Sequence, residues 1–443
     1  MGSSANSAEK FPLHQAVFNY DKREIKRLLE SNNIRDIIDC QDVHGNTALL
    51  LAVMLGYCDV VADLLAKGAD IRIESNDGWN ALVEAISYGN RKMISCILAE
   101  QNHRSRLMLV TRKPHFIKLL SGLNDFYMEL KWDFETWIPL LSNLLPSDTC
   151  KIYKRGTQLR VDTSLVDFHD LIWQRGDISL LFSPQNATQS IVIMDNKKRI
   201  FQDGQKLWKV VGSRSHEKEV DEIMSQDIVS VECSTKTIGF TRAMSGWLFR
   251  QEKKEAVGDF PAIDYMVNGL RVVTRKRREH LSDEDLKRNK EFMKVFSSKE
   301  ATAESVAKLP GTSRRKDLSP PIRPNLSWTE YISASSAPIL GRPHVEKTTV
   351  KEFRPSEEFP LPIEVFVDIL EILSPFKKFE KLRQFFTMKM PPGFPVKLEV
   401  PLIATVSAKL SFEKFEWRDR FAPDFFVIPS DYKEEQRRFK ELF

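Results

Sequence analysis

The sequence predicts an α+β fold, with a helical repeat array at the N-terminus followed by a mainly antiparallel, β-rich region with added helices. Two observations carry this prediction. Residues near the N-terminus repeat at an offset of 33, and their apolar positions have the spacing of helices. From about Lys151 onward, apolar and polar residues alternate, which is the period of a strand. Of the 443 residues, 42% are hydrophobic and 28 are Phe, so the chain has enough apolar material for real cores.

Residues 42–52 and 75–85 are two copies of one pattern, a turn glycine followed by a short apolar helix. The matching positions are Gly45 and Gly78, Leu49 and Leu82, Ala52 and Ala85, and further on Val61 and Ile94, Leu64 and Ile97, and Leu65 and Leu98. A 33-residue period with these features is the ankyrin signature. Residues 12–29 form a first copy, in which His14 has the position of a turn-bonding structural histidine. We therefore expect about three ankyrin repeats within residues 11–102, stacked as an α-solenoid.

Changes of pattern divide the rest of the chain. Residues 1–10 contain no apolar core and are expected to be disordered. Residues 103–150 are expected to form a helical cap on the repeats, because apolar residues recur at helical spacing from Phe116 to Leu130. Residues 275–345 are expected to be a charged helix followed by a Pro- and Ser-rich linker that is poorly ordered in part.

Alternating segments within residues 151–274 predict the first part of the β-rich domain. They lie at 158–163, 178–182, 189–194, 199–202, 206–211, 228–232, 236–240 and 246–250, with one helix near 217–225. Short connections between them predict antiparallel pairing. Residues 346–443 are expected to be the α/β C-terminal part of this domain, with helices at 362–373 and 375–388 and strands at 397–406 and 408–415.

Several functional classes lack their sequence signals. No run of about 18 apolar residues is present, and the N-terminus does not have the apolar region of a secretory signal. The five cysteines are scattered without a CxxC pair, which favours reduced thiols in the cytosol and no zinc site. Nucleotide-binding, metalloprotease and serine-hydrolase motifs are absent, so we predict no cofactor and no enzymatic activity. The alternative, His169 acting as a base beside Asp167 and Asp170, is disfavoured against a strand-end surface cluster.

Basic residues are concentrated in one place, although the net charge of +5 is too small to predict nucleic-acid binding. The basic cluster consists of Arg271, Arg275, Lys276, Arg277 and Arg278. We favour a solvated helix start or linker for it. Contact with anionic lipid on a cytosolic membrane face is the alternative of functional interest, and a nuclear localisation signal is a third.

Four further stretches resemble the ankyrin repeat domain-containing protein 13 family, which carries a so-called GPCR-chaperone domain. These stretches are residues 144–153, 162–182, 245–250 and 390–401. With the repeats they cover nearly the whole chain. Ubiquitin-binding members of the family end in acidic helices with an Ala and a Ser at fixed spacing, whereas Asp431–Phe443 has an acidic pair and neither of these residues. The chain therefore resembles the C-type branch, which lacks ubiquitin-interacting motifs.

The resemblance implies a non-enzymatic chaperone or retention factor for G-protein-coupled receptors or other membrane-protein clients. It implies peripheral attachment to the cytosolic side of the endoplasmic reticulum, without ubiquitin as a partner. Ankyrin repeats bind partners through hairpin tips and a concave groove. The expected partner-binding residues are Val43, His44, Asp77 and Trp79 at the tips, and Met54, Leu55, Ser87 and Tyr88 in the groove. A ubiquitin-linked endocytic adaptor and a general ankyrin scaffold are the alternative functions.

Trp79 leaves two alternatives open. Beside Asp77, it could receive a basic segment of a client through a cation–π contact and an ion pair. It could instead pack against the hairpin of the neighbouring repeat.

Overall fold

The computed structural model describes most of the two halves of the chain. The described residues are 10–136, 147–169, 172–186, 189–204, 214–234, 239–242, 244–245, 251–252, 254–268, 271–297, 314–343, 346–351, 356–357, 396–403, 406–435 and 439. The helices expected at 362–373 and 375–388, the strands expected at 206–211 and 246–250, and the N-terminal nine residues lie outside them.

Paired helices at the N-terminus confirm the ankyrin prediction. They are α2 (Pro12–Phe18), α3 (Lys22–Leu29), the short α4 (Ile34–Ile37), α5 (Ala48–Met54), α6 (Cys58–Ala66), α7 (Ala81–Tyr88) and α8 (Arg91–Ser121). Side chains cap the helix starts: Thr47 accepts from the backbone N–H of Leu50, and Asn80 from that of Val83. His14 Nε2 lies 3.0 Å from the Cys40 carbonyl and 3.1 Å from that of Asn46, which confirms its structural role.

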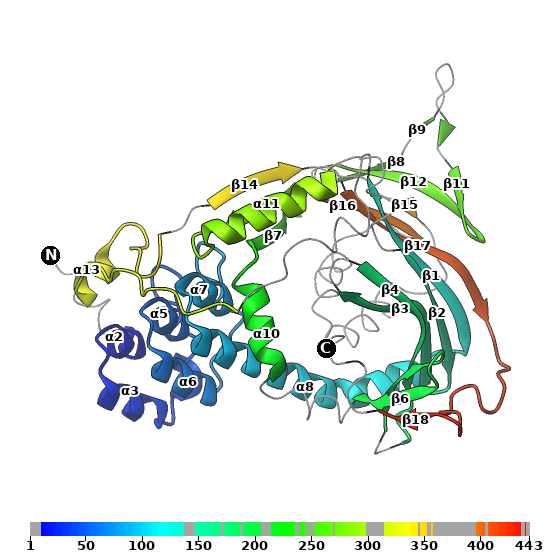
Figure 1. The fold of residues 1–443 in the computed structure, drawn as a ribbon, viewed down its shortest axis with the longest axis horizontal. Coiled ribbons are helices and arrows are strands. Elements are labelled where there is room, and N and C mark those ends of the chain that lie inside the picture. Colours follow the sequence, from blue (N-terminus) through cyan, green and yellow to red (C-terminus); the bar gives the residue numbers. More distant parts are fainter. Residues whose placement is uncertain are drawn as a thin grey trace.

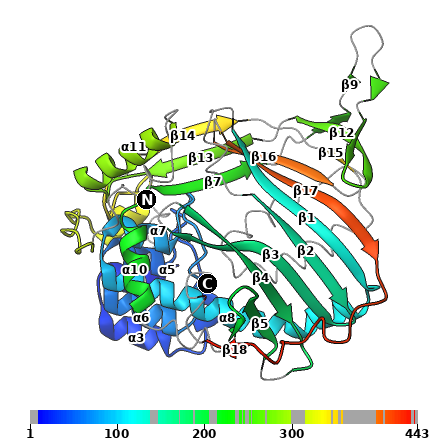
Figure 2. The ribbon, with the colours of Figure 1, turned by 45° about the vertical axis from the view of Figure 1, so that its right-hand side comes forward.

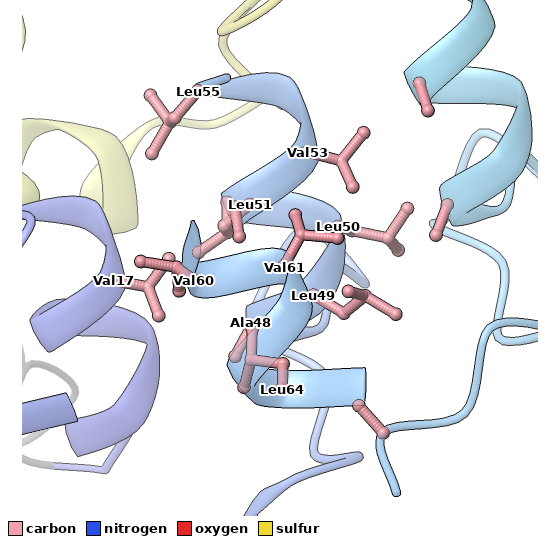
Figure 3. Close-up of a cluster of buried hydrophobic side chains, with 14 of the residues drawn as sticks. Val17, Ala48, Leu49, Leu50, Leu51, Val53, Leu55, Val60, Val61 and Leu64 are labelled. Atoms are coloured by element: carbon pink, nitrogen blue, oxygen red, sulfur yellow. The ribbon is translucent and has the colours of Figure 1, made fainter. Parts of the chain in front are cut away.

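Apolar residues of α5 and α6 form the centre of the repeat core. Leu49, Leu51, Val61 and Leu64 are at most 1% exposed, and Figure 3 shows them between the helices of neighbouring repeats. Ala52 is also fully buried, and its small side chain lets the paired helices approach closely. A polar or charged side chain at any of these positions would have no route to water.

The helical cap expected at 103–150 is correct only in its first part. Helix α8 continues the last repeat but stops at Ser121, with Gly122 as its C-cap. Residues Phe126–Thr136 form strand β1, and β2 follows at Asp148–Arg155. The apolar residues after Gly122 alternate with polar ones from Phe126 to Phe134. The expected cap therefore combines two patterns, a helical spacing before Gly122 and the alternation of a strand after it.

Nine strands form one large, curved sheet that confirms the mainly antiparallel prediction (Figures 1 and 2). Its order is β16 (Lys397–Ile403), β17 (Val406–Trp417), β1, β2, β3 (Gln158–His169), β4 (Ile172–Phe182), β5 (Ile191–Asp195), β6 (Ile200–Asp203) and β18 (Lys433–Glu434). Every pair is antiparallel except β18 with β6. Strand β1 lies between β2 and β17, so residues from the chain's two halves form adjacent strands of the sheet.

Smaller sheets lie beside the repeats and beyond the large sheet. One has the order β14 (Glu346–Lys351), β13 (Arg271–Arg277) and β7 (Ile228–Ser234). The others contain β8 (Gly239–Arg242), β9 (Met244–Ser245), β10 (Gln251–Glu252), β11 (Lys254–Val257), β12 (Phe260–Asn268) and β15 (Ser356–Glu357). Helix α10 (Arg214–Ile223) confirms the helix expected near 217–225 and packs against α8.

The charged helix expected from residue 275 is wrong in its first turns. Helix α11 spans Asp283–Ser297, whereas Arg271–Arg277 belong to β13, which pairs on both sides. The β-branched run Val272-Val273-Thr274 favours a strand, and this signal outweighs the high charge of the residues after it, on which the expectation of a helix rests. In the part of the chain described here, no helix combines the length and apolarity needed to span a membrane.

The expected linker is in part a well-packed element. Residues 314–343 lie on the ankyrin repeats and include helix α13 (Trp328–Ser333). Trp328, Tyr331, Ile332 and Leu340 are each at most 5% exposed and join the repeat core. These apolar side chains, placed among Pro and Ser, give the segment enough buried surface to oppose the entropy of an open chain.

Candidate protein-binding surface

Residues 314–342, here named the covering segment, run across the ankyrin array and back (Figure 1). At its start, Leu318 donates its backbone N–H to the Gly89 carbonyl at 2.9 Å, at the end of α7. Helix α13 then packs near α2, and the return path places Leu340 in the repeat core and Gly341 against Met54 of α5. The segment thus crosses the repeats in both directions and covers the ends of α2, α5 and α7.

Two arginines of the covering segment cap the ends of inner helices. Arg323 donates to the Phe18 carbonyl at 2.9 Å, and its guanidinium lies 5.3 Å from the ring centre of Tyr57. Arg342 donates to the Ser87 carbonyl at 3.0 Å and to the Tyr88 carbonyl at 3.3 Å. The last carbonyls of a helix have no partner within the helix and carry its negative dipole end, so a guanidinium is well suited to them.

Tyr331 fills a polar pocket in the hairpin tip between the first two repeats. Its hydroxyl donates to Asp42 Oδ2 at 2.7 Å and accepts from Asn46 Nδ2 at 2.8 Å. His44 Nε2 lies 2.8 Å from the Tyr331 carbonyl. Phe18 packs on the phenol ring at 5.2 Å between ring centres, and the side chain is fully buried.

The tip itself holds the carboxylate of Asp42 in place. Asp42 Oδ1 accepts from the backbone N–H groups of His44 and Asn46, each at 2.9 Å, which leaves Oδ2 directed at the hydroxyl of Tyr331. Burial, together with the nearby charge of Asp42, raises the pKa of Tyr331 well above its ordinary value. The phenol therefore stays protonated and serves as a hydrogen-bond donor.

Local sequence explains why α13 forms at this point of the covering segment. Ser327 accepts from the backbone N–H of Glu330, and the Glu330 side chain accepts from the Ser327 backbone, which completes a capping box. One helical turn then places Trp328, Tyr331 and Ile332 on the side that meets the repeats, since residues three and four apart share a face.

A second occupied site surrounds Trp79, which is 1% exposed. The guanidinium carbons of Arg275 and Arg277 lie 4.8 and 4.9 Å from its ring centre. Arg275 also donates to the backbone carbonyls of Asp77 and Gly78. Trp79 does receive basic groups, but they come from β13 of the same chain and not from a client segment.

Arg277 is the centre of a buried ionic network between the repeats and β13. It pairs with Glu84 Oε1 and Glu279 Oε1, both at 2.7 Å, while Ser87 donates to Glu279 at 2.8 Å. Burial alone would raise the pKa of Glu279, but the Arg277 charge and the Ser87 hydroxyl lower it overall. The pKa of Arg277 is raised, because its carboxylate partners outweigh the opposing effect of burial.

The structure brings most of the expected partner-binding residues together, but under other parts of the chain. His44, Met54, Ser87 and Tyr88 contact the covering segment, and Leu55 is 8% exposed. Asp77 and Trp79 contact β13. Val43 is 49% exposed and remains at the surface. The expectation of an open groove is therefore corrected: this groove is filled from within the chain.

Four members of the basic cluster, Arg275 to Arg278, make contacts within the chain and none lies at a helix start, which corrects the expectation of a solvated helix start. Arg277 is fully buried. Lys276 and Arg278, whose side chains are 40% and 52% exposed, both pair with Asp227 at 3.3 and 2.8 Å. The side chain of Arg271 lies outside the description.

His169 is the last residue of β3. Among the described residues, no group of His, Cys, Asp and Glu has the arrangement of a metal site.

Sequence reasoning predicted His44 but missed the other residues of the Tyr331 pocket, and it missed the two arginines that cap helix ends, Arg323 and Arg342. Phe18, Asp42 and Asn46 belong to the recognised repeats, but nothing in their pattern indicates a phenol partner. The covering segment did carry a signal, since Ser327 and Glu330 have capping-box spacing beside two aromatic residues. That spacing predicts an ordered helix within a stretch that its Pro and Ser content had marked as a linker.

Comparison with known proteins places the chain in a family. A family model described as ANKRD13 C-terminal matches residues 160–441, and a model of ankyrin repeats (3 copies) matches residues 2–75. The chain is 46% identical over 439 residues to ankyrin repeat domain-containing protein 13C of Mus musculus, covering 98% of this chain and 79% of that protein. This chain belongs to the ankyrin repeat domain-containing protein 13 family.

Within the ankyrin repeat domain-containing protein 13 family, the chain is more similar to the 13C relatives than to 13B. The 13C protein of Danio rerio is 45% identical over 439 residues, covering 98% of this chain and 88% of that protein. The 13B protein of Mus musculus is 31% identical over 434 residues, covering 94% and 69%. The C-terminal model begins inside β3, although β1 and β2 belong to the same sheet, so the structural unit starts earlier than the matched region.

Proposed function

We propose that this protein is a non-enzymatic chaperone or retention factor for G-protein-coupled receptors. It regulates their biogenesis and their exit from the endoplasmic reticulum, and it acts peripherally from the cytosolic face. Membership of the ankyrin repeat domain-containing protein 13 family supports this proposal. The observation that carries it is a surface that already binds a polypeptide segment: the ends of α2 and α7 and the hairpin tip at Asp42 hold the covering segment through backbone carbonyls and a side-chain pocket.

This surface suits transient holding of a polypeptide. Its fixed acceptors are the carbonyls of Phe18, Ser87 and Tyr88 at helix ends, so a bound segment gains hydrogen bonds by bringing an arginine to each helix end, whatever the residues between. The Tyr331 pocket adds one specific position. Binding of this kind requires no bond to be made or broken.

Two experiments test the proposed function. Proximity labelling in cells should mark membrane proteins of the endoplasmic reticulum, and a receptor client should co-precipitate with the full chain. Predominant labelling of endosomal coat proteins, together with firm binding of ubiquitin chains, would overturn the proposal in favour of the endocytic adaptor.

Membrane attachment is part of the same proposal and has its own test. A peripheral protein is released from microsomes by alkaline carbonate or high salt. Lys276→Ser with Arg278→Ser removes the two exposed basic side chains while retaining Arg277. If lipid contact contributes, this double variant binds anionic vesicles more weakly. Equal binding would assign the attachment to a protein partner.

A further inference from the structure

The covering segment occupies the very face with which an ankyrin array binds partners. We propose that it is an exchangeable internal ligand, and that the partner which replaces it presents an unphosphorylated tyrosine on a short capped turn, with an arginine about eight residues before it, as Arg323 precedes Tyr331. This deepens the proposed function, on which it rests only for the identification of the partner as a receptor client.

The chemistry of the face defines this partner. Toward Arg323, Arg342, the Tyr331 hydroxyl hydrogen and the Leu318 backbone N–H, the face offers acceptors: the Asp42 carboxylate and the carbonyls of Phe18, Ser87, Tyr88 and Gly89. Its donors, Asn46, His44 and Arg91, meet oxygen atoms of Tyr331 and of the first residues of the segment. A partner must therefore bring donors, which are arginine side chains, a phenolic hydroxyl and backbone N–H groups. A carboxylate in the place of Tyr331 or of the two arginines would meet repulsion from Asp42 or from the negative ends of the helices. The acidic Asp317 lies elsewhere, at the start of α8, where it accepts from the Arg91 backbone N–H at 2.7 Å.

The pocket distinguishes tyrosine from its analogues. Phenylalanine fills the space beside Phe18 but leaves buried atoms of Asp42 and Asn46 without their partner, a cost that corresponds to about tenfold or more in affinity. Phosphotyrosine places two negative charges against the Asp42 carboxylate in a fully buried site. Phosphorylation of a partner's tyrosine would therefore prevent its binding.

The way in which the covering segment is attached favours release of its middle part, which contains α13. Near its start, Arg315 pairs with Asp285 at 2.7 Å and its backbone N–H bonds Asp221, which fixes this end to α10 and α11. Near its other end, Arg342 bonds the end of α7. The first anchor thus lies on α10 and α11 and the second at the end of α7, whereas α13 lies at the first repeat. The part of the segment around α13 can therefore lift while its two ends stay in place.

Outward-facing residues show that the covering segment is not an ordinary buried core element. Ile322 is 94% exposed and Ile339 is 58% exposed, although their neighbours Arg323 and Leu340 contact the repeats. The segment is thus a single layer over the array, with one face bound and the other in solvent. A tethered ligand of this kind competes at an effective concentration on the order of millimolar.

The test uses a fluorescent synthetic peptide with the sequence of residues 314–343 and the full chain as receptor. Wild type should bind the peptide weakly, because its own segment occupies the face. The Trp328→Ala, Tyr331→Ala double variant should bind it at least tenfold more tightly. The milder Tyr331→Phe chain retains the ring and guards against loss of folding; it should show an intermediate gain. Val43→Ser, on the exposed edge of the same tip, is the matched control and should behave as wild type.

Peptide analogues test the specificity. Peptides with Phe or phosphotyrosine at position 331 should bind the double variant at least tenfold more weakly than the tyrosine peptide. If neither the double variant nor Tyr331→Phe binds the peptide, and the circular dichroism of both is unchanged, the covering segment is a permanent part of the core and the proposal is overturned. Equal binding of the tyrosine and phenylalanine peptides would overturn the tyrosine specificity.

Receptor capture separates this inference from the proposed function. If the double variant and Tyr331→Phe bind the peptide and also capture more receptor than wild type, both proposals are supported. If they bind the peptide while receptor capture stays at background, the exchangeable segment stands and the receptor client is wrong.

Discussion

Replacing Arg277 by methionine should destabilise the protein more than any other single loss of charge in the basic cluster. The Arg277 side chain is 0% exposed, and its partners Glu84 and Glu279 are only 6% and 4% exposed. Removing the guanidinium leaves two buried carboxylates without their shared cation. Breaking a buried pair by deleting one partner costs about 3–5 kcal/mol, and the lost contact with Trp79 adds about 0.5–2 kcal/mol.

Equilibrium unfolding in urea, followed by far-UV circular dichroism, measures the loss for Arg277→Met. Arg278→Met is the matched control, because its side chain is 52% exposed and pairs with Asp227 at the surface; it should cost at most about 1 kcal/mol. Removing the Glu84 charge as well, in Arg277→Met with Glu84→Met, should recover part of the loss, and the double-mutant cycle gives the coupling. If Arg277→Met were as mild as Arg278→Met, the buried network would contribute little and the reasoning would be wrong.

Three further predictions concern the repeats and their contacts. Leu64→Asp buries an unpaired charge at a fully buried position and should lower the free energy of unfolding by several kcal/mol, whereas Val43→Asp, at a half-exposed position, should change it by less than about 0.5 kcal/mol in the same urea titration. Trp79→Ala should lower stability by about 3–5 kcal/mol, with receptor capture falling only as the folded fraction falls; a stable variant with reduced capture would instead support a direct client contact. The pKa of Glu279 is lowered in the folded state. The stability that its carboxylate contributes is therefore present above its unfolded pKa of about 4.3 and is lost as pH falls through the folded pKa. Glu279→Gln should flatten the pH dependence of stability between about pH 5 and pH 3, and an unchanged slope would contradict this.

The repeats were the most predictable part of the structure because their period is set by local geometry. The second and third copies each have a glycine at the tip, a capped helix start and small residues between helices, and these features recur at a fixed offset in the sequence. Gly45 and Gly78 illustrate this, since both have positive φ angles, of 76° and 71°. Strands β3 to β6, β16 and β17 of the large sheet were predicted for a similar reason, because alternation is a local signal, whereas β1 and the start of β2 fell within the expected helical cap.

The candidate site was harder to predict because its contacts join residues far apart in the sequence. The sequence offered a basic group as one of two alternative partners for Trp79, and it singled out the basic cluster while favouring a solvated helix start or linker for it. That each is the other's partner depends on the path of the chain between residues 79 and 275, which no local pattern records. Similarly, Asp42 and Tyr331 meet across 289 positions of sequence.

These long-range contacts also determine which part of the chain can be expected to fold alone. Three repeats are close to the smallest array that buries its own apolar faces. Here the array gains Tyr331 and Trp328 from the covering segment, and Arg277 from β13 neutralises Glu84 of α7. A fragment ending near residue 150 would lack all of these, exposing Phe18 and Trp79 and leaving Glu84 without its arginine. The ankyrin array and the C-terminal half therefore stabilise each other, and any partner that lifts the covering segment must itself replace the contacts that hold the array together.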